Sequence, residues 1–395
     1  MSMDRFGDKV CCNPTVKLRR QESYPVIDID KITPGYKTVR SVESVEYTGQ
    51  GGAKFQDHDV LFARITPCLE NGKMAIADTE GQNGIGSTEL FVFRGINGVS
   101  DTDYVYYLLC MKHIRQLAAN SMTGASGRQR ADLDFIKRIQ WDFPDIETQN
   151  KISSALSVYD DLIEVNNKRI KTLEQMAENL YKEWFVRFRF PGHETAEFEN
   201  GIPKGWVYCT VEALTSVLQR GISPDYDDGG TLTVISQKCI RQNIMDIKEA
   251  RKQTKTFKPE LNLMDGDTVI CSTGTGTLGR VGQVFGDYPD TTFDSHVTLV
   301  RAKPGVGKHF LYWTLKEMQT WFMNMGIGST NQQELYRGTI KNAKALTPTN
   351  SLIAQFERAV EPIHSSIISL TRRQENLVRQ RDLLLPRLMS GKLEV

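Results

Sequence analysis

The chain has 395 residues, which predicts two or three domains, and its 39% hydrophobic and 25% charged residues are ordinary for a globular protein. The net charge of +1 does not indicate a nucleic-acid binder, nor does it exclude one whose charges gather on one face. The N-terminal segment MSMDRFGDKV lacks an apolar stretch, and no apolar run reaches membrane-span length. With seven scattered Cys that lack metal spacing, we expect a cytoplasmic protein with reduced thiols and no membrane contact.

Residues 1–149 predict a mixed α/β domain of short strands. Two β-leaning runs, VLF at 60–62 and MAIA at 74–77, flank Asn71-Gly72, which is a strong hairpin signal. LFVFR (90–94) predicts another strand, and residues 103–119 have a helical period. A polar, Gly-bearing loop follows, and we expect one more strand within 133–143.

Residues 150–190 predict a long coiled-coil helix. Apolar or small side chains recur in steps of four and three from Ile152 to Trp184, and the one polar exception is Asn166. A helix with a single apolar stripe needs a partner helix. We expect its seam to include Ile152, Leu156, Ile163, Ile170, Leu173 and Leu180.

The second half of the chain repeats the first. Gly124 matches Gly328 and Pro144 matches Pro348, in each case 204 residues later, so the sequence indicates two copies of one unit. Residues 191–350 are expected to hold a linker and a second domain, and residues 351–395 the partner helix. Pro362 and Pro386 predict that this helix is short or kinked and begins at Pro362. Its predicted seam residues are Val360, Ile363, Ile367, Leu377 and Leu384.

The fold class predicted by these patterns is α/β (α+β). Two duplicated globular domains, 1–149 and 191–350, are joined by two long antiparallel helices, 150–190 and 351–395, in a pseudo-two-fold arrangement.

Motifs for enzymatic chemistry are weak in this sequence. GTGTLG (274–279) fits the dinucleotide pattern GxGxxG, but the strand-like RVGQVF follows where a helix should begin, so a connecting loop suffices. The six His residues have no metal spacing, and no catalytic grouping stands out. We therefore assign no catalytic residue, metal site or cofactor to this chain.

Two polar loops, TGASGRQR (123–130) and IGSTNQQ (327–333), occupy equivalent positions of the two copies yet differ in sequence. Arg, Asn and Gln read base edges, while Ser, Thr and loop amides hold phosphates. The loops could equally be solvated surface, but a retained scaffold with different loops suits two different DNA half-sites. The candidate contacts in the first copy are Arg64, Thr66, Asn71, Lys73, Ser87, Thr88, Ser126, Arg128, Gln129 and Arg130. Those in the second copy are Thr273, Thr275, Thr277, Arg280, His296, Ser329, Thr330, Asn331, Gln332 and Gln333.

Several stretches carry a resemblance to a known family: DVLFARITPCLENGK (59–73), IGSTE (85–89), ALSVYDDLIEVNNKRIKTLEQMAENLYKEWFVRF (155–188), IPKGW (202–206) and, within 356–395, FERAVEPI and LLLPRLMSGKLEV. The chain resembles the specificity subunit of type I restriction–modification systems. The resemblance implies a non-catalytic subunit with two target recognition domains, which read the two parts of a gapped double-stranded DNA sequence. It also implies that two methyltransferase subunits dock on the helices and that restriction/translocase subunits join them. S-adenosylmethionine, ATP and Mg are then expected in those partners.

Three alternatives remain open from the sequence. The chain could be a coiled-coil scaffold without DNA function, or a specificity subunit that serves a methyltransferase alone. The third is an enzyme that binds a nucleotide at GTGTLG.

Overall fold

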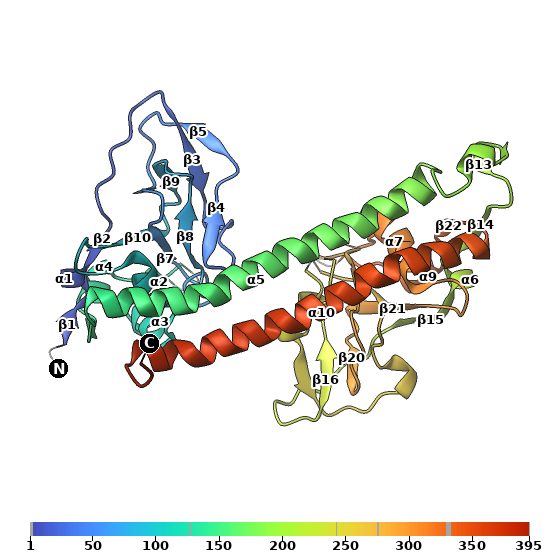
Figure 1. The fold of residues 1–395 in the computed structure, drawn as a ribbon. Helices are drawn as coiled ribbons and strands as arrows, with labels where there is room; N and C mark the ends of the chain where they lie inside the picture. Colours follow the sequence, from blue (N-terminus) through green and yellow to red (C-terminus); the bar gives the residue numbers. More distant parts are fainter. Residues whose placement is uncertain (1–2, 126–127, 242, 275, 329–332, 395) are drawn as a thin grey trace. The chain divides into compact units, whose positions relative to one another are not determined.

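The computed structural model describes residues 3–125, 128–241, 243–274, 276–328 and 333–394. The chain divides into two compact units, Met1–Asn167 with Arg373–Val395 (unit 1) and Lys168–Arg372 (unit 2). Each unit holds one globular α/β domain and one part of each of two long helices, α5 (Ile146–Tyr181) and α10 (Asn350–Met389) (Figure 1). The fold class is therefore the one predicted, two α/β domains with two long helices.

The domain of unit 1 is built on two sheets, of order β2-β10-β7-β8-β4 and β5-β3-β9-β6, and a short pair β1-β11. Within the first sheet β7 pairs antiparallel with β8 across the Asn71-Gly72 turn, where Gly72 has a φ of 71°, so the predicted hairpin is confirmed. The strands are β1 (Asp4–Arg5), β2 (Val10–Cys12), β3 (Ser23–Ile27), β4 (Thr38–Arg40), β5 (Ser44–Glu46), β6 (Ala53–Phe55), β7 (Val60–Ala63), β8 (Met74–Asp78), β9 (Gly84–Gly86), β10 (Leu90–Gly95) and β11 (Gln140–Trp141).

The continuous apolar run of β7 is explained by burial on both faces. Val60 and Phe62 belong to one core cluster, which includes α2, whereas Leu61 and Ala63 belong to another, which includes Phe55 of the second sheet. Because alternate residues of a strand point to opposite faces, a strand covered on both sides needs apolar residues throughout.

The helices of unit 1 differ from the predicted pattern in two places. Where one helix was expected over 103–119, the chain turns at Met111, whose extended backbone (ψ 127°) separates two helices. The strand expected within 133–143 is present as β11, but a short helix that was not predicted precedes it, and Asp132 caps this helix by accepting from the amides of Asp134 and Phe135. The helices are α1 (Phe6–Lys9), α2 (Thr102–Cys110), α3 (Lys112–Asn120) and α4 (Leu133–Lys137).

Unit 2 repeats this topology. Its main sheet has the order β15-β21-β18-β19 and its outer sheet the order β17-β16-β20. In the outer sheet β16 is antiparallel to β17 and parallel to β20, as β3 is to β5 and β9 in unit 1. The strands are β12 (Phe198–Glu199), β13 (Ile202–Pro203), β14 (Val207–Thr210), β15 (Thr215–Arg220), β16 (Leu232–Ile235), β17 (Arg251–Gln253), β18 (Thr268–Cys271), β19 (Val281–Gln283), β20 (Thr291–Phe293), β21 (Val297–Ala302) and β22 (Lys344–Thr347).

A buried ion pair also recurs in the two units. Asp59, directly before β7, accepts two hydrogen bonds from Arg94 at 2.6 and 2.7 Å, and Asp267, directly before β18, accepts two from Arg301, both at 2.7 Å. The helices of unit 2 are α6 (Val211–Leu214), α7 (Lys308–Glu317), α8 (Gln319–Asn324) and α9 (Arg337–Asn342), with 3-10 turns η2 (His193–Thr195), η3 (Gln237–Cys239), η4 (Ile247–Glu249) and η5 (Pro259–Leu261).

The long helices pair inside each unit. In unit 1, Ile152 and Leu156 share a core cluster with Leu385 and Leu388, so the end of α10 packs against the beginning of α5 (Figure 1). In unit 2 the end of α5 continues as a π-helical turn, η1 (Lys182–Val186), and its aromatic side chains pack on Phe356 of α10. Both pairs are antiparallel, as predicted. None of the helices in the described residues is long and apolar enough to cross a membrane.

The C-terminal helix does not begin at Pro362, and that expectation was wrong. α10 is continuous from Asn350 to Met389 through both prolines. Apolar side chains that are buried before Pro362 offset the helix penalty of about 3 kcal/mol. Ile353, Phe356 and Val360 are all buried there.

The seam residues predicted on the two helices lie at inward-facing positions of their units. Five are buried, namely Ile152, Leu156, Ile163, Val360 and Ile367, and the other six are half-buried, namely Ile170, Leu173, Leu180, Ile363, Leu377 and Leu384. Asn166 is also buried, and its side-chain amide nitrogen has no hydrogen-bond partner among the described residues.

Candidate nucleic-acid interface

The polar loop of unit 1 is held against the turn that follows β7. Arg130 forms isolated β-bridges with both Ile65 and Thr123. The amide of Thr66 donates to the Gln129 carbonyl at 3.0 Å, and the Gln129 amide donates to the Thr66 hydroxyl at 3.1 Å. These bonds bring the turn and the loop, which are far apart in sequence, into one edge of the domain.

Charged and polar groups gather at this edge. Arg130 donates through Nε and Nη2 to the two oxygens of Glu89, at 2.9 and 2.5 Å, and these bonds hold the pKa of the Glu89 carboxyl below its ordinary value. The Ser87 hydroxyl accepts from the Glu89 amide, and the Arg64 guanidinium lies 4.7 Å from the centre of the Phe91 ring. The Arg130 side chain stays 44% exposed, so a fixed guanidinium is presented to solvent. Thr88 and Arg128 are exposed beside it.

Unit 2 has the same edge with the charges exchanged. Glu334 forms β-bridges with Thr273 and Ile327, and it stands 204 residues after Arg130. Its carboxylate pairs with Arg220 of β15. The Thr273 hydroxyl is 2.6 Å from Nδ1 of His296. Where unit 1 presents an arginine held by a glutamate, unit 2 presents a glutamate held by an arginine.

The remaining candidates divide into three groups. Lys73 and Arg280 donate to backbone carbonyls, of Ile29 at 2.8 Å and of Ile240 at 2.9 Å, and the Thr277 hydroxyl donates to the Thr273 carbonyl. These contacts are structural in the free chain. Asn71, at the hairpin turn, and Gln333, next to Glu334, are exposed. Ser126, Thr275, Ser329, Thr330, Asn331 and Gln332 lie outside the described residues.

Three residues at these edges, Glu89, Arg220 and Glu334, were not among the sequence candidates. Glu89 closes the IGSTE stretch, and Glu334 is found by adding the repeat offset of 204 to Arg130. Arg220 had no sequence signal, because its pairing depends on how β15 lies beside β21.

The GTGTLG segment does not open a helix. It connects β18 to β19, an antiparallel pair, which is not the strand–turn–helix context of a dinucleotide fingerprint. Within the described residues no group of three or more His, Cys, Asp or Glu side chains is placed to hold a metal ion.

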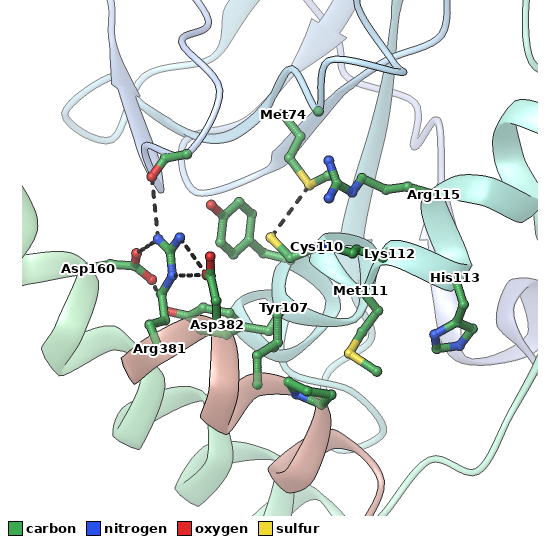
Figure 2. Close-up of a pocket in the computed structure, with 15 residues that line it drawn as sticks. Met74, Tyr107, Cys110, Met111, Lys112, His113, Arg115, Asp160, Arg381 and Asp382 are labelled. Atoms are coloured by element: carbon green, nitrogen blue, oxygen red, sulfur yellow. Dashed lines mark hydrogen bonds and ion pairs between the residues drawn. The ribbon is translucent and has the colours of Figure 1, made fainter. Parts of the chain in front are cut away.

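A cavity of about 580 Å³ lies in unit 1, between α2, α3 and the two long helices (Figure 2). At its edge Arg381 of α10 donates to Asp160 of α5 at 2.5 Å and to Asp382, and Asp160 also accepts from the Tyr107 hydroxyl at 2.5 Å. Burial raises the pKa of the Cys110 thiol to about 12, so this thiol is not a reactive thiolate. The cavity therefore lies where the globular domain of unit 1 packs against α5 and α10.

Comparisons with known proteins agree on one family. A model of the "Type I restriction modification DNA specificity domain" matches residues 12–175. The type I restriction enzyme MjaIX specificity subunit of Methanocaldococcus jannaschii is 24% identical over 310 residues, covering 74% of this chain and 69% of that protein. The HindI specificity subunit of Haemophilus influenzae is 23% identical over 421 residues, covering 87% and 88%. The crystal structure of a type I restriction–modification S subunit from M. genitalium has the same fold, with a TM-score of 0.54 and 14% identity over 98% of this chain and 95% of that one.

Proposed function

We propose that this chain is a specificity subunit of a type I restriction–modification system and that it reads a gapped, two-part DNA sequence with one domain for each part. Its role in the complex is recognition. The methyl transfer and DNA cleavage of such a system are assigned to partner subunits, together with their S-adenosylmethionine, ATP and Mg. We place the complex in the cytoplasm, where the host DNA lies.

The exchanged charges at the two equivalent edges support two different half-sites. Arg130 offers hydrogen-bond donors, which suit the O6 and N7 acceptors of guanine. Glu334 offers acceptors, which suit the N4 amino group of cytosine. Because each charged group is held by its own partner, its orientation is fixed before DNA binds, which lowers the entropic cost of binding.

The docking surface for the methyltransferase is assigned to the outer face of α5. Val158, Leu162 and Val165 are 57%, 37% and 49% exposed, and their spacing of four and three residues places them on one stripe. Exposed apolar stripes of this kind suit a partner helix. We propose that two methyltransferase subunits bind the long helices and that restriction/translocase subunits join through them.

Adenine methylation mapped across the host genome, with and without this gene, tests the proposal. Loss of methylation at a gapped motif on deletion is the expected result. Unchanged methylation, combined with failure of the chain to co-purify with a methyltransferase, would favour a scaffold protein and overturn the proposal. Co-purification with a methyltransferase but with no restriction subunit would identify a methyltransferase-only system.

A further inference from the structure

Unit 2 carries an exposed cationic surface that the recognition edges do not use. The segment 238–258 contains seven basic residues and two acidic ones, and all seven basic side chains are exposed. We define these as the basic ridge: Lys238, Arg241, Lys248, Arg251, Lys252, Lys255 and Lys258. The ridge runs along β17, the edge strand of the outer sheet, and through the turns on either side of it.

The central cations of the ridge are held in place by neutral groups. The Arg251 guanidinium stacks 3.6 Å from the centre of the Tyr226 ring, Lys252 donates to the Thr233 hydroxyl at 3.1 Å, and Lys255 donates to the Ser223 carbonyl at 2.8 Å. A cation over an aromatic ring or beside a neutral oxygen keeps its full charge. These side chains are therefore both ordered and electrostatically unsatisfied.

Few carboxylates pair with the cations of the basic ridge. Among the described residues, Lys238, Lys248, Arg251, Lys252 and Lys255 form no ion pair. The other two have only long ones, Arg241 with Glu249 at 3.7 Å and Lys258 with Glu260 at 3.8 Å. Exposed pairs at such distances contribute little.

The equivalent sheet of unit 1 is different. Its edge strand β5 carries exposed Glu46 and follows exposed Glu43, and nearby Arg40 pairs with Glu80 at 2.7 Å. Charges on an edge strand also prevent pairing with other sheets, but either sign serves that purpose, as β5 illustrates. Edge protection therefore does not account for the positive excess along β17.

We infer that the basic ridge binds the phosphate backbone of duplex DNA and that unit 2 alone supplies this sequence-independent contact. The inference rests on the proposed function, because it takes DNA as the ligand. Each phosphate neutralised by Lys or Arg releases condensed counterions, which makes affinity depend steeply on salt. Such contacts position a protein on the duplex, while other groups read the bases. Unit 1 is then left to bind mainly through its recognition edge.

The test measures binding of the full chain to a fluorescent duplex of arbitrary sequence across a range of KCl concentrations. The ridge variant is Arg251→Gln with Lys252→Gln and Lys255→Gln. The matched control removes three cations near the outer sheet of unit 1, by Lys17→Gln, Arg40→Gln and Lys54→Gln. The slope of log K against log salt should become shallower by about 2 to 3 in the ridge variant, at roughly 0.9 for each phosphate contact, and should stay nearly unchanged in the control.

Equal slopes for the wild-type chain and the ridge variant would overturn the inference, as would equal changes in the ridge variant and the control. If the ridge variant lost binding to single-stranded RNA but kept its binding to duplex DNA, the ridge would be assigned to RNA. This result would also overturn the inference. If the triple variant does not fold, Lys252→Gln alone should lower the slope by about 1. The salt slope could stay unchanged in the ridge variant while deletion of the gene still removes methylation at a gapped motif. That combination would overturn the DNA-binding role of the basic ridge and leave the proposed function standing.

Discussion

Arg381 of α10 and Asp160 of α5 form an ion pair that joins the two long helices in unit 1. The Arg381 side chain is 13% exposed and lies beside the 3% exposed side chain of Asp160. Arg381→Ala should destabilise the unit by about 3–5 kcal/mol, because a buried carboxylate is left without its cation. Urea unfolding measures this loss. The double variant Asp160→Asn with Arg381→Met should recover much of it, whereas Asp382→Asn, at the exposed partner, should cost less than about 1 kcal/mol. Equal losses for all three would show that packing, not charge, dominates.

Arg128 tests recognition at the level of one side chain. It is exposed on the loop of unit 1, so Arg128→Ala should change stability by less than about 0.5 kcal/mol. If Arg128 contacts a base or phosphate, the methylated motif should relax at one half-site only, and Lys17→Ala, also exposed in unit 1, should leave both half-sites intact. Methylation mapping reads out both half-sites at once. Equal relaxation of the two would assign Arg128 a structural role.

The outer stripe of α5 is an element that can be altered without touching the core. Leu162→Asp with Val165→Asp should leave the fold intact, since both side chains are exposed, but should abolish co-purification with the methyltransferase. Lys151→Asp, on an exposed face of the same helix, is the matched control. Retention of the methyltransferase by the double variant would move its docking surface off this stripe.

Local patterns predicted the elements well where burial follows a simple period. The runs at Val60 and Met74 became β7 and β8 because both faces of the sheet are covered, and the period-four seam became α5. The predictions from local sequence failed where tertiary packing overrode a local preference for secondary structure. Pro362 stayed inside α10, and the helix expected over 103–119 is broken at Met111.

At the scale of the whole chain, the internal duplication predicted which residues are equivalent in the two units, and no single motif did so. An offset of 204 residues links Arg130 to Glu334, and the two form the same β-bridges in their units. What the offset could not supply was the partner of each charge. Glu89 lies in the turn before β10, whereas Arg220 ends β15, so only the folded topology brings them to the edges.

Unit 2 holds two ionisable groups whose pKa shifts change stability in opposite directions with pH. Burial lowers the pKa of His309 to about 4, with nearby His364 adding to the shift, and burial raises the pKa of Glu174 to about 7. Between about pH 4 and 6.5, His309 is protonated in the unfolded chain but neutral in the folded chain. This group therefore makes the free energy of unfolding rise with pH in that range. The folded chain keeps the Glu174 proton that the unfolded chain releases above 4.5, so stability falls between about 4.5 and 7.

The two effects therefore oppose each other in the same pH range. In Glu174→Gln the free energy of unfolding, relative to the wild-type chain, should rise with pH between about 4.5 and 7. In His309→Asn the same difference should fall between about 4 and 6.5. Urea unfolding at several pH values, followed by the fluorescence of buried Trp313, gives both differences. Parallel pH profiles for wild type and both variants would mean that neither group titrates on unfolding, and that other ionisable groups in unit 2 set its acid stability.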